Sequence, residues 1–168
     1  SQVVFITDDE SVLNSVVKEL SLQLTELPRK DFAEESLQSS VFLLVQDLDA
    51  AFEIANDYAP EHLILLLAEP KQWVSRIENA GSVFLGAWSP ESAGDYASGT
   101  NHTLPTGGRA RALSGVSLDS FIKKITFQEL SHEGLQNIAS TVECMAEAEG
   151  LLGHSRAVSV RLNGEGER

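Results

Sequence analysis

Two neighbouring side chains, Glu61 and His62, stand directly before the apolar run 63–67. A carboxylate beside an imidazole can move protons, and burial at the mouth of a strand shifts the pKa values of both groups toward those useful in acid/base catalysis. Pro60 restricts the backbone ahead of this pair. The alternative is a solvated pair at a strand end, because open α/β sheets usually bind ligands at the opposite, carboxyl ends of their strands.

A second candidate lies in segment 92–102, which is rich in small residues that let a backbone approach a ligand closely. It contains Asp95 and His102. Carboxylate oxygen and imidazole nitrogen are ligands that suit zinc or manganese. Surface loops also carry isolated aspartate and histidine residues, so a site without metal is the alternative.

A third candidate lies on a late amphipathic helix. Its apolar face is formed by Leu135, Ile138, Ala139, Val142, Met145, Ala146 and Leu152. At about 100° per residue, Glu149 falls within this stripe, where a carboxylate must be paired or functional. His154 follows just past the expected helix end, after Gly153. The alternative is a frayed helix end, with Glu149 reaching solvent and His154 capping the helix by its charge.

The glycine pair Gly107 and Gly108 precedes Arg109 and Arg111, and this arrangement could hold a phosphate or form a simple turn. The chain has no Gly-x-Gly-x-x-Gly motif and no Walker loop. An α/β pattern here therefore comes without a nucleotide-binding fingerprint.

Four apolar runs and four helical patterns alternate in the first half of the chain. We expect strands at 3–6, 41–45, 63–67 and 82–85, and helices at 12–27, 32–37, 47–58 and 70–80. Thr7 and Glu10 have the spacing of a capping box, Asp47 is a plausible N-cap, and Pro28 and Gly81 are expected helix stops. Because the strands are apolar throughout, they predict a Rossmann-like α/β sheet with helices on both faces.

The pattern changes after Gly86. Segment 87–115 has no periodicity and is expected to be a long functional loop, packed by Phe84, Trp88 and Tyr96. Ser131 is the expected cap of a helix that runs to about residue 152, and 157–162 resembles a short edge strand. We therefore divide the chain into a partial Rossmann-like domain with an active-site loop, 1–115, and a C-terminal helical dimerisation tail, 116–168.

Composition narrows the function further. The 168 residues contain 12 Lys and Arg against 25 Asp and Glu, a net charge of −13. This balance argues against binding to nucleic acid or to an anionic membrane. The lone cysteine, Cys144, cannot form an internal disulfide, and neither a signal peptide nor a membrane span is evident. A reducing compartment, the cytoplasm, is the expectation, with a plastid as the alternative for a plant protein.

Several motifs together resemble the histidinol dehydrogenase family. They are YAPEHL at 58–63, GSVFLG at 81–86, SPESAGDY at 89–96, GTNH at 99–102, LPTG at 104–107 and AEAEGLLGH at 146–154. The resemblance covers essentially the whole chain. It implies a zinc-dependent enzyme that oxidises L-histidinol to L-histidine through the aldehyde with two molecules of NAD, in the last steps of histidine synthesis.

The resemblance also assigns roles to the candidate residues. His62 matches the general base that takes the alcohol proton, and Glu61 matches the residue that activates the attacking water. Asp95 and His154 match zinc ligands and substrate contacts, and His102 and Glu149 match positions that contact the substrate. No residue of this chain matches an NAD contact. In the family the C-terminal segment is swapped between the two subunits of a homodimer, so each site is completed in trans.

The chain differs from the family in length, since family members are more than twice as long. The other two zinc ligands would lie a few residues before Ser1, and the region that contacts NAD would also lie outside this chain. Because zinc usually takes four ligands, we expect the 168 residues alone to be inactive. The alternatives are a non-catalytic dimerisation module, and a metal-dependent hydrolase that works without NAD.

Overall fold

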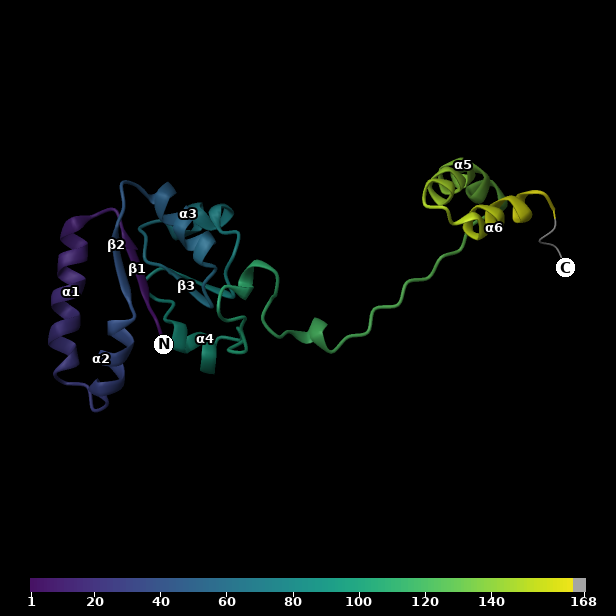
Figure 1. The fold of residues 1–168 in the computed structure, drawn as a ribbon. Helices are drawn as coiled ribbons and strands as arrows, with labels where there is room; N and C mark the ends of the chain where they lie inside the picture. Colours follow the sequence, from purple (N-terminus) through teal and green to yellow (C-terminus); the bar gives the residue numbers. More distant parts are fainter. Residues whose placement is uncertain (165–168) are drawn as a thin grey trace. The chain divides into compact units, whose positions relative to one another are not determined.

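The computed structural model describes residues 1–164, which form two compact units, 1–122 and 123–164 (Figure 1). The first unit contains β1 (Val4–Thr7), α1 (Glu10–Leu24), α2 (Lys30–Gln38), β2 (Val41–Leu44), α3 (Leu48–Tyr58), β3 (His62–Leu65), β4 (Ser82–Leu85) and α4 (Glu91–Tyr96). Three short 3₁₀ turns lie at Pro70–Arg76, Arg109–Arg111 and Leu118–Ser120. The second unit contains α5 (His132–Ala148) and α6 (Leu152–Leu162).

The four predicted strands are present and they pair in parallel. β1 pairs with β2, with Val4 opposite Val41, and β3 pairs with β4, with His62 opposite Ser82. Hydrogen bonds join the strands as two separate two-stranded sheets. The mixed α/β class and the parallel pairing are therefore confirmed, whereas a single Rossmann-like sheet and a swapped dimer tail stay predictions.

The buried apolar side chains of the first unit come from α3, from its C-cap residue and from strands β3 and β4. Phe52 of α3 is buried and stacks on Trp73, with ring centroids 5.3 Å apart, and Leu65 and Phe84 are buried on the neighbouring strands. We predicted that helices cover both faces of the sheet, and the structure differs. Leu44 and Ile64 are about half exposed, at 49% and 48%. The stabilisation from burying these strands is correspondingly incomplete.

The capping-box spacing predicts Thr7 as the cap of helix α1, and this prediction is wrong. The N-cap residue is Asp9. The Asp9 carboxylate accepts hydrogen bonds from the backbone N–H groups of Ser11, at 2.7 Å, and Val12, at 3.3 Å. Thr7 is the last residue of β1, so its backbone belongs to the strand, and its hydroxyl accepts a bond from the Asp9 N–H instead. The Ser11 hydroxyl and these N–H groups hold the pKa of Asp9 below its ordinary value.

Helix α3 begins and ends where the sequence predicts. Asp47 is its N-cap, as predicted, and accepts a 2.8 Å bond from the N–H of Ala50. At the other end, Ala59 adopts the left-handed conformation with φ 52° and is 1% exposed. Pro60 follows with its ring-restricted φ, so two consecutive constrained residues lead into Glu61.

The helix predicted at 70–80 is wrong: only a 3₁₀ turn, Pro70–Arg76, forms there. The side chain of Asn56 explains its early end. Its amide donates to the carbonyl of Arg76 at 2.8 Å, and its oxygen accepts from the N–H of Glu78 at 2.8 Å. These bonds to a side chain replace the backbone bonds that would continue the helix.

The second unit corrects two further predictions. Helix α5 begins at its predicted cap, Ser131, but ends at Ala148, because Gly150 has φ 72° and closes the helix with a Schellman motif. The N–H of Leu151 bonds to the carbonyl of Ala146 and that of Gly150 to the carbonyl of Glu147. The predicted edge strand 157–162 belongs to helix α6.

Helices α5 and α6 pack against each other through small residues. Ala139 and Ala146 of α5 and Ser155 and Val158 of α6 are buried in this second unit. Ser155 and Val158 are three residues apart and lie on the same face of a helix. Packing of this face favours a helix over the strand that the alternation of apolar and polar residues in 157–162 predicted. No helix in the described part of the chain combines the length and the apolar character needed to cross a membrane.

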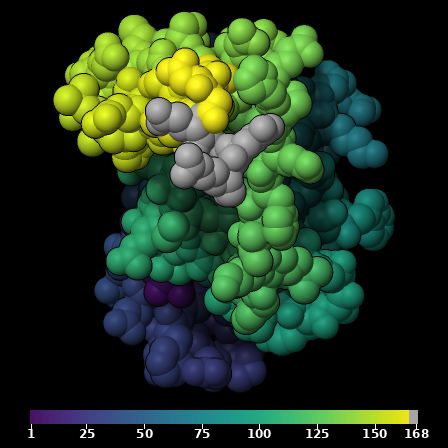
Figure 2. All heavy atoms as spheres, turned by 90° about the vertical axis from the view of Figure 1, so that its right-hand side faces the viewer, coloured from purple at the N-terminus to yellow at the C-terminus, as the bar shows by residue number. Residues whose placement is uncertain are grey.

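Large apolar side chains are exposed on the segment between α4 and α5. They include Leu113, Val116, Leu118, Phe121, Ile122, Ile125, Phe127 and Leu130. Much of this stretch, drawn in light green, lies at the surface in the space-filling view (Figure 2). The segment carries no strand or α-helix.

Candidate active site

The backbone of the Glu61–His62 pair is fixed by the neighbouring strand. His62 is the first residue of β3, and the carbonyls of Pro60 and Glu61 accept bonds from Gly81 and Ser82, each at 2.9 Å. A Cβ at Gly81 would lie 2.6 Å from the Glu61 carbonyl oxygen, so this close approach requires glycine. The pair therefore sits on a rigid support, as a proton-transferring group requires.

Helix α4 packs against Phe84 of β4 and brings Glu91 close to His62 at the start of β3. The chain turns at Gly86, with φ 79°, and α4 begins after Pro90. Gly94 lies buried against the ring of Phe84: a Cβ there would be 2.6 Å from Phe84 Cε1 and 2.7 Å from Thr100 Oγ1. The absence of a side chain at this residue lets the short helix lie directly on the strand pair.

This packing brings three polar side chains together. One potential ligand atom from each of His62, Glu91 and Asp95 lies within 4.8 Å of the others. Glu91 and Asp95 are four residues apart on α4, so they share one face of the helix. The sequence placed His62 and Asp95 in one site, and the structure brings both into this cluster.

The His62 ring is held between an aromatic ring and a carboxylate. Its centroid lies 5.9 Å from that of Phe84, and its Nε2 lies 3.7 Å from Oε1 of Glu91. The Nε2 atom is buried and has no hydrogen-bond partner in the described part of the chain. A buried polar atom without a partner is costly, and such atoms are found where a ligand or a catalytic step supplies the partner.

The other predicted residues of the first unit lie near the cluster in sequence but outside it. Glu61 is half-buried beside His62, at the junction between Pro60 and β3. His102 is exposed and is not a member of the three-residue cluster. The side chain of its neighbour Asn101 donates to the carbonyl of Val116 and accepts from the N–H of Thr103, so the loop on both sides of His102 is tied down.

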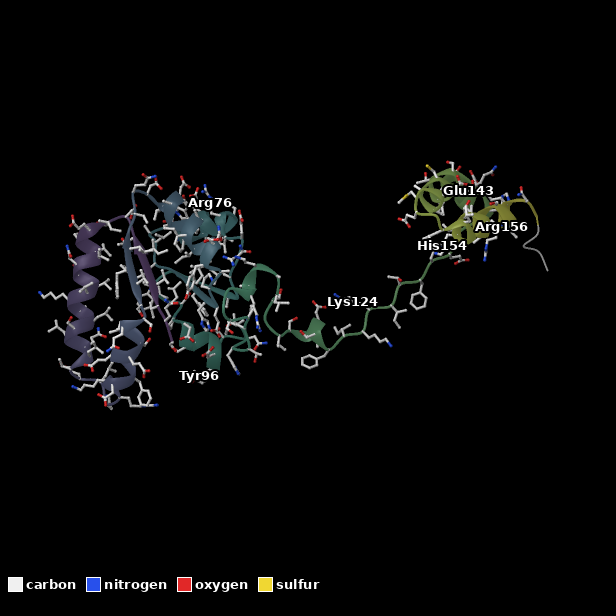
Figure 3. The ribbon with its side chains drawn as sticks, viewed as in Figure 1. Arg76, Tyr96, Lys124, Glu143, His154 and Arg156 are labelled. Carbon is white, nitrogen blue, oxygen red and sulfur yellow. The ribbon has the colours of Figure 1, made fainter. Side chains whose placement is uncertain are left out.

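The two predicted residues of the second unit are exposed. Glu149 is the C-cap residue of α5, so the prediction that it lies on a buried helix face is wrong for this unit. The helix ends before residue 149 because Gly150 terminates it. His154, labelled in Figure 3, lies in the first turn of α6 and not beyond a helix end. Both side chains are therefore accessible to a binding partner.

The glycine pair is a turn, which the sequence left open. Gly107 and Gly108 both have positive φ, 62° and 75°. Arg111 is paired with Asp57: its Nη2 lies 3.1 Å from Oδ1 and also donates to the backbone carbonyl of the same residue. This arginine fastens the turn to the end of α3 and is not available to hold a phosphate.

Glu91 is the member of the cluster that the sequence analysis did not identify. Segment 87–115 was expected to be irregular, so the four-residue spacing of Glu91 and Asp95 carried no meaning there. The signal that could have found it is Pro90, a residue common at helix starts, followed at once by a glutamate.

The fold and the cluster define a class: a mixed α/β protein with an imidazole–carboxylate site suited to proton transfer and to hard or borderline cations. The sequence profile of the histidinol dehydrogenase family matches residues 1–162. The chain belongs to the histidinol dehydrogenase family, which confirms the resemblance drawn from its motifs.

Individual relatives agree with this assignment. The chain is 56% identical over 162 residues to the histidinol dehydrogenase of Bacteroides fragilis, covering 96% of this chain and 38% of that protein. It is 52% identical over 163 residues to the chloroplastic histidinol dehydrogenase of Arabidopsis thaliana, covering 96% of this chain and 35% of that protein. The chain thus spans little more than a third of the length of these relatives.

A solved structure shows the same similarity in three dimensions. The crystal structure of histidinol dehydrogenase from Elizabethkingia anophelis matches with a TM-score of 0.88 and 53% identity, covering 97% of this chain and 38% of that one. At this identity the likeness extends to the sequence as well as to the fold.

Proposed function

We propose that this chain supplies part of the catalytic machinery of a histidinol dehydrogenase, which oxidises L-histidinol to L-histidine through the aldehyde with two molecules of NAD in histidine biosynthesis. The observation that supports it most is the buried, unpartnered Nε2 of His62 beside two carboxylates, in a chain whose residues 1–162 match this family.

Two residues at the start of β3 would handle the protons. In the first oxidation the alcohol loses a hydride to NAD, and His62 takes the proton of its hydroxyl group. The second oxidation needs water on the aldehyde carbon, and Glu61 would remove a proton from that water as its oxygen attacks. The hydrate anion formed in this way would lose a hydride to the second NAD and become the carboxylic acid.

The residues present suit a zinc ion in part. Asp95 offers a carboxylate oxygen within the cluster and His154 offers an exposed imidazole, and oxygen and nitrogen donors are those that zinc accepts. Asp95 and His154 would hold the ion, which when bound would orient the imidazole and amine of the substrate. Zinc usually takes four protein or solvent ligands, so further ligands must come from residues other than these two.

The second unit would complete the site from a partner subunit. His154 and Glu149 are exposed at neighbouring positions of the α5–α6 junction, as side chains donated to another chain would be. Glu149 would contact the substrate amine, and His102 would contact the substrate from the loop of the first unit. We propose a homodimer with exchanged C-terminal segments, and inactivity of the 168 residues on their own.

A chimera tests the function directly. Residues 1–162 of this chain replace the aligned segment of the Bacteroides fragilis relative, and NADH formation from L-histidinol is followed by absorbance. We expect turnover in this chimera, and we expect His62→Asn to lower it by about 10²- to 10⁴-fold. His132→Asn, at an exposed residue of α5, is the matched control. Unchanged turnover in the His62 variant of a folded chimera would remove this residue from the mechanism.

Metal content tests the zinc assignment separately from turnover. We expect the purified chimera to retain zinc in elemental analysis, and we expect Asp95→Asn to lose most of it. Asp31→Asn, an exposed aspartate on α2, should retain it. Equal zinc content in the Asp95 and Asp31 variants would exclude Asp95 as a ligand.

The compartment is also a proposal. The Arabidopsis thaliana relative is named as chloroplastic. We therefore propose a plastid for a plant source of this chain and the cytoplasm for a bacterial one.

A further inference from the structure

We infer that Glu91 is a positioning residue for His62: its carboxylate faces Nε2, holds the imidazole ring and stabilises the positive charge that the ring acquires when its other nitrogen, Nδ1, takes the substrate proton. This inference rests on the proposed function, because it assigns a task to His62. Glu91 itself need not touch the substrate.

The geometry supports this pairing. Oε1 of Glu91 lies 3.7 Å from Nε2 of His62, an atom that is itself buried and has no hydrogen-bond partner among residues 1–164. That distance is longer than a hydrogen bond, and catalytic contacts in structures without a ligand are often long and shorten when substrate binds. The Phe84 ring lies against the imidazole at a tilt of 38° and restricts its other motions.

The pair is placed for function more than for stability. The side chains of His62 and Glu91 are 25% and 37% exposed, and ion pairs with that access to water contribute little to folding. The close contact of Gly94 with Phe84 places the backbone of α4 beside the strands, and this brings both Glu91 and Asp95 to His62. A carboxylate that is brought to this position, but contributes little to folding stability, is best explained by what it does to His62.

Kinetics separate positioning from substrate binding. In the chimera, Glu91→Gln removes the charge and retains the size of the side chain, whereas Glu91→Asp retains the charge and shortens the side chain. We expect Glu91→Gln to lower kcat about tenfold or more while KM changes less than about twofold, and Glu91→Asp to recover part of the loss. Glu53→Gln, at an exposed position of α3, is the control with the same change in charge. A Glu91→Gln variant with the turnover of the Glu53→Gln control would overturn the inference.

A spectroscopic measurement on the 168-residue chain tests the pairing without any turnover. The chain has 4 histidines, so His62→Asn identifies the ring nitrogen signals of His62 in a ¹⁵N NMR spectrum. We expect Glu91→Gln and Glu91→Ala to shift these signals and Glu53→Gln to leave them in place. Unshifted signals in both Glu91 variants would refute the pairing. If His62→Asn left the chimera fully active, the role proposed for His62 would fail, while this spectrum would still decide whether Glu91 acts on the ring.

Discussion

Replacing Gly94 with alanine should damage the site more than the fold. The backbone at Gly94 lies outside the left-handed region, so alanine is compatible with its conformation. The added methyl group, however, would meet Phe84 Cε1 at 2.6 Å and Thr100 Oγ1 at 2.7 Å. Carbon atoms in contact prefer about 3.5–4.0 Å, so helix α4 would have to move by about 1 Å from the strand.

Two opposing terms set the change in stability. Forcing a methyl group into a packed contact costs about 1–3 kcal/mol, and replacing glycine by alanine within a helix gains about 1 kcal/mol. The net loss in the free energy of unfolding should therefore be about 0–2 kcal/mol. The effect on turnover is larger, because a displacement of about 1 Å between reacting groups can cost about 10²-fold. Helix α4 carries Glu91 and Asp95, and both would move relative to His62.

The assay measures thermal unfolding and NADH formation on the same chimera. We expect Gly94→Ala to remain folded and to lose most of its turnover. Ser92→Ala, at an exposed residue of the same helix, should match the parent in both measurements. If Gly94→Ala kept the turnover of the Ser92→Ala control, the close contact between α4 and Phe84 would not set the geometry of the site.

Three further predictions concern the elements that support the site. Ser11→Ala should raise the pKa of Asp9 back toward its ordinary value of 3.8, because the Ser11 hydroxyl is the main cause of its lowering. A lowered carboxyl pKa stabilises the fold above the ordinary value, and this stabilisation is lost as the pH falls through the lowered pKa. NMR titration and acid unfolding of the variant should therefore both show a weaker contribution from Asp9. An unchanged titration would contradict this. Asn56→Ala should cost about 0.5–1.5 kcal/mol in urea unfolding, because the N–H of Glu78 exchanges its side-chain acceptor for water. An unchanged free energy of unfolding would contradict this. Ser131→Ala should cost about 1 kcal/mol of helix stability, because it removes the cap of α5. Circular dichroism should show a loss of helix content, and a gain in helix content would refute the cap.

Local signals in the sequence predicted much of the first unit. The apolar runs gave the four strands, and Asp47 gave the correct start of α3. The 70–80 region failed because a side chain far along the chain, Asn56, takes over the backbone bonds of the turn. Helical periodicity reports which face would be buried, and it contains no information about such a competing partner.

The prediction of one helix up to about residue 152 was wrong because it placed Gly150 inside that helix. Glycine after the last apolar position of a helix is a stop signal, and its positive φ produces the observed Schellman motif. With this stop recognised, His154 falls within a new helix, and the apparent alternation of 157–162 becomes the exposed and buried faces of α6.

The candidate site was predicted in part, and the missing part has a physical reason. His62 and Asp95 could be named because their residue types and the family motifs pointed to them. Glu91 could not, since its role depends on a six-residue helix, too short to show a periodic pattern, and on the contact of Gly94 with Phe84. Contacts between elements that are distant along the chain leave no local signature.

The left-handed alanine at the end of α3 has a consequence for which part of the site can move. Ala59 is almost fully buried in a conformation that costs alanine energy, and the next residue is a proline whose φ is restricted. The backbone that leads into the Glu61–His62 pair is thus stiff. The two carboxylates of the cluster come from a six-residue helix that is followed by a glycine-containing loop. Any change in the distance between His62 and these carboxylates must therefore come from α4, while the proton acceptor stays still.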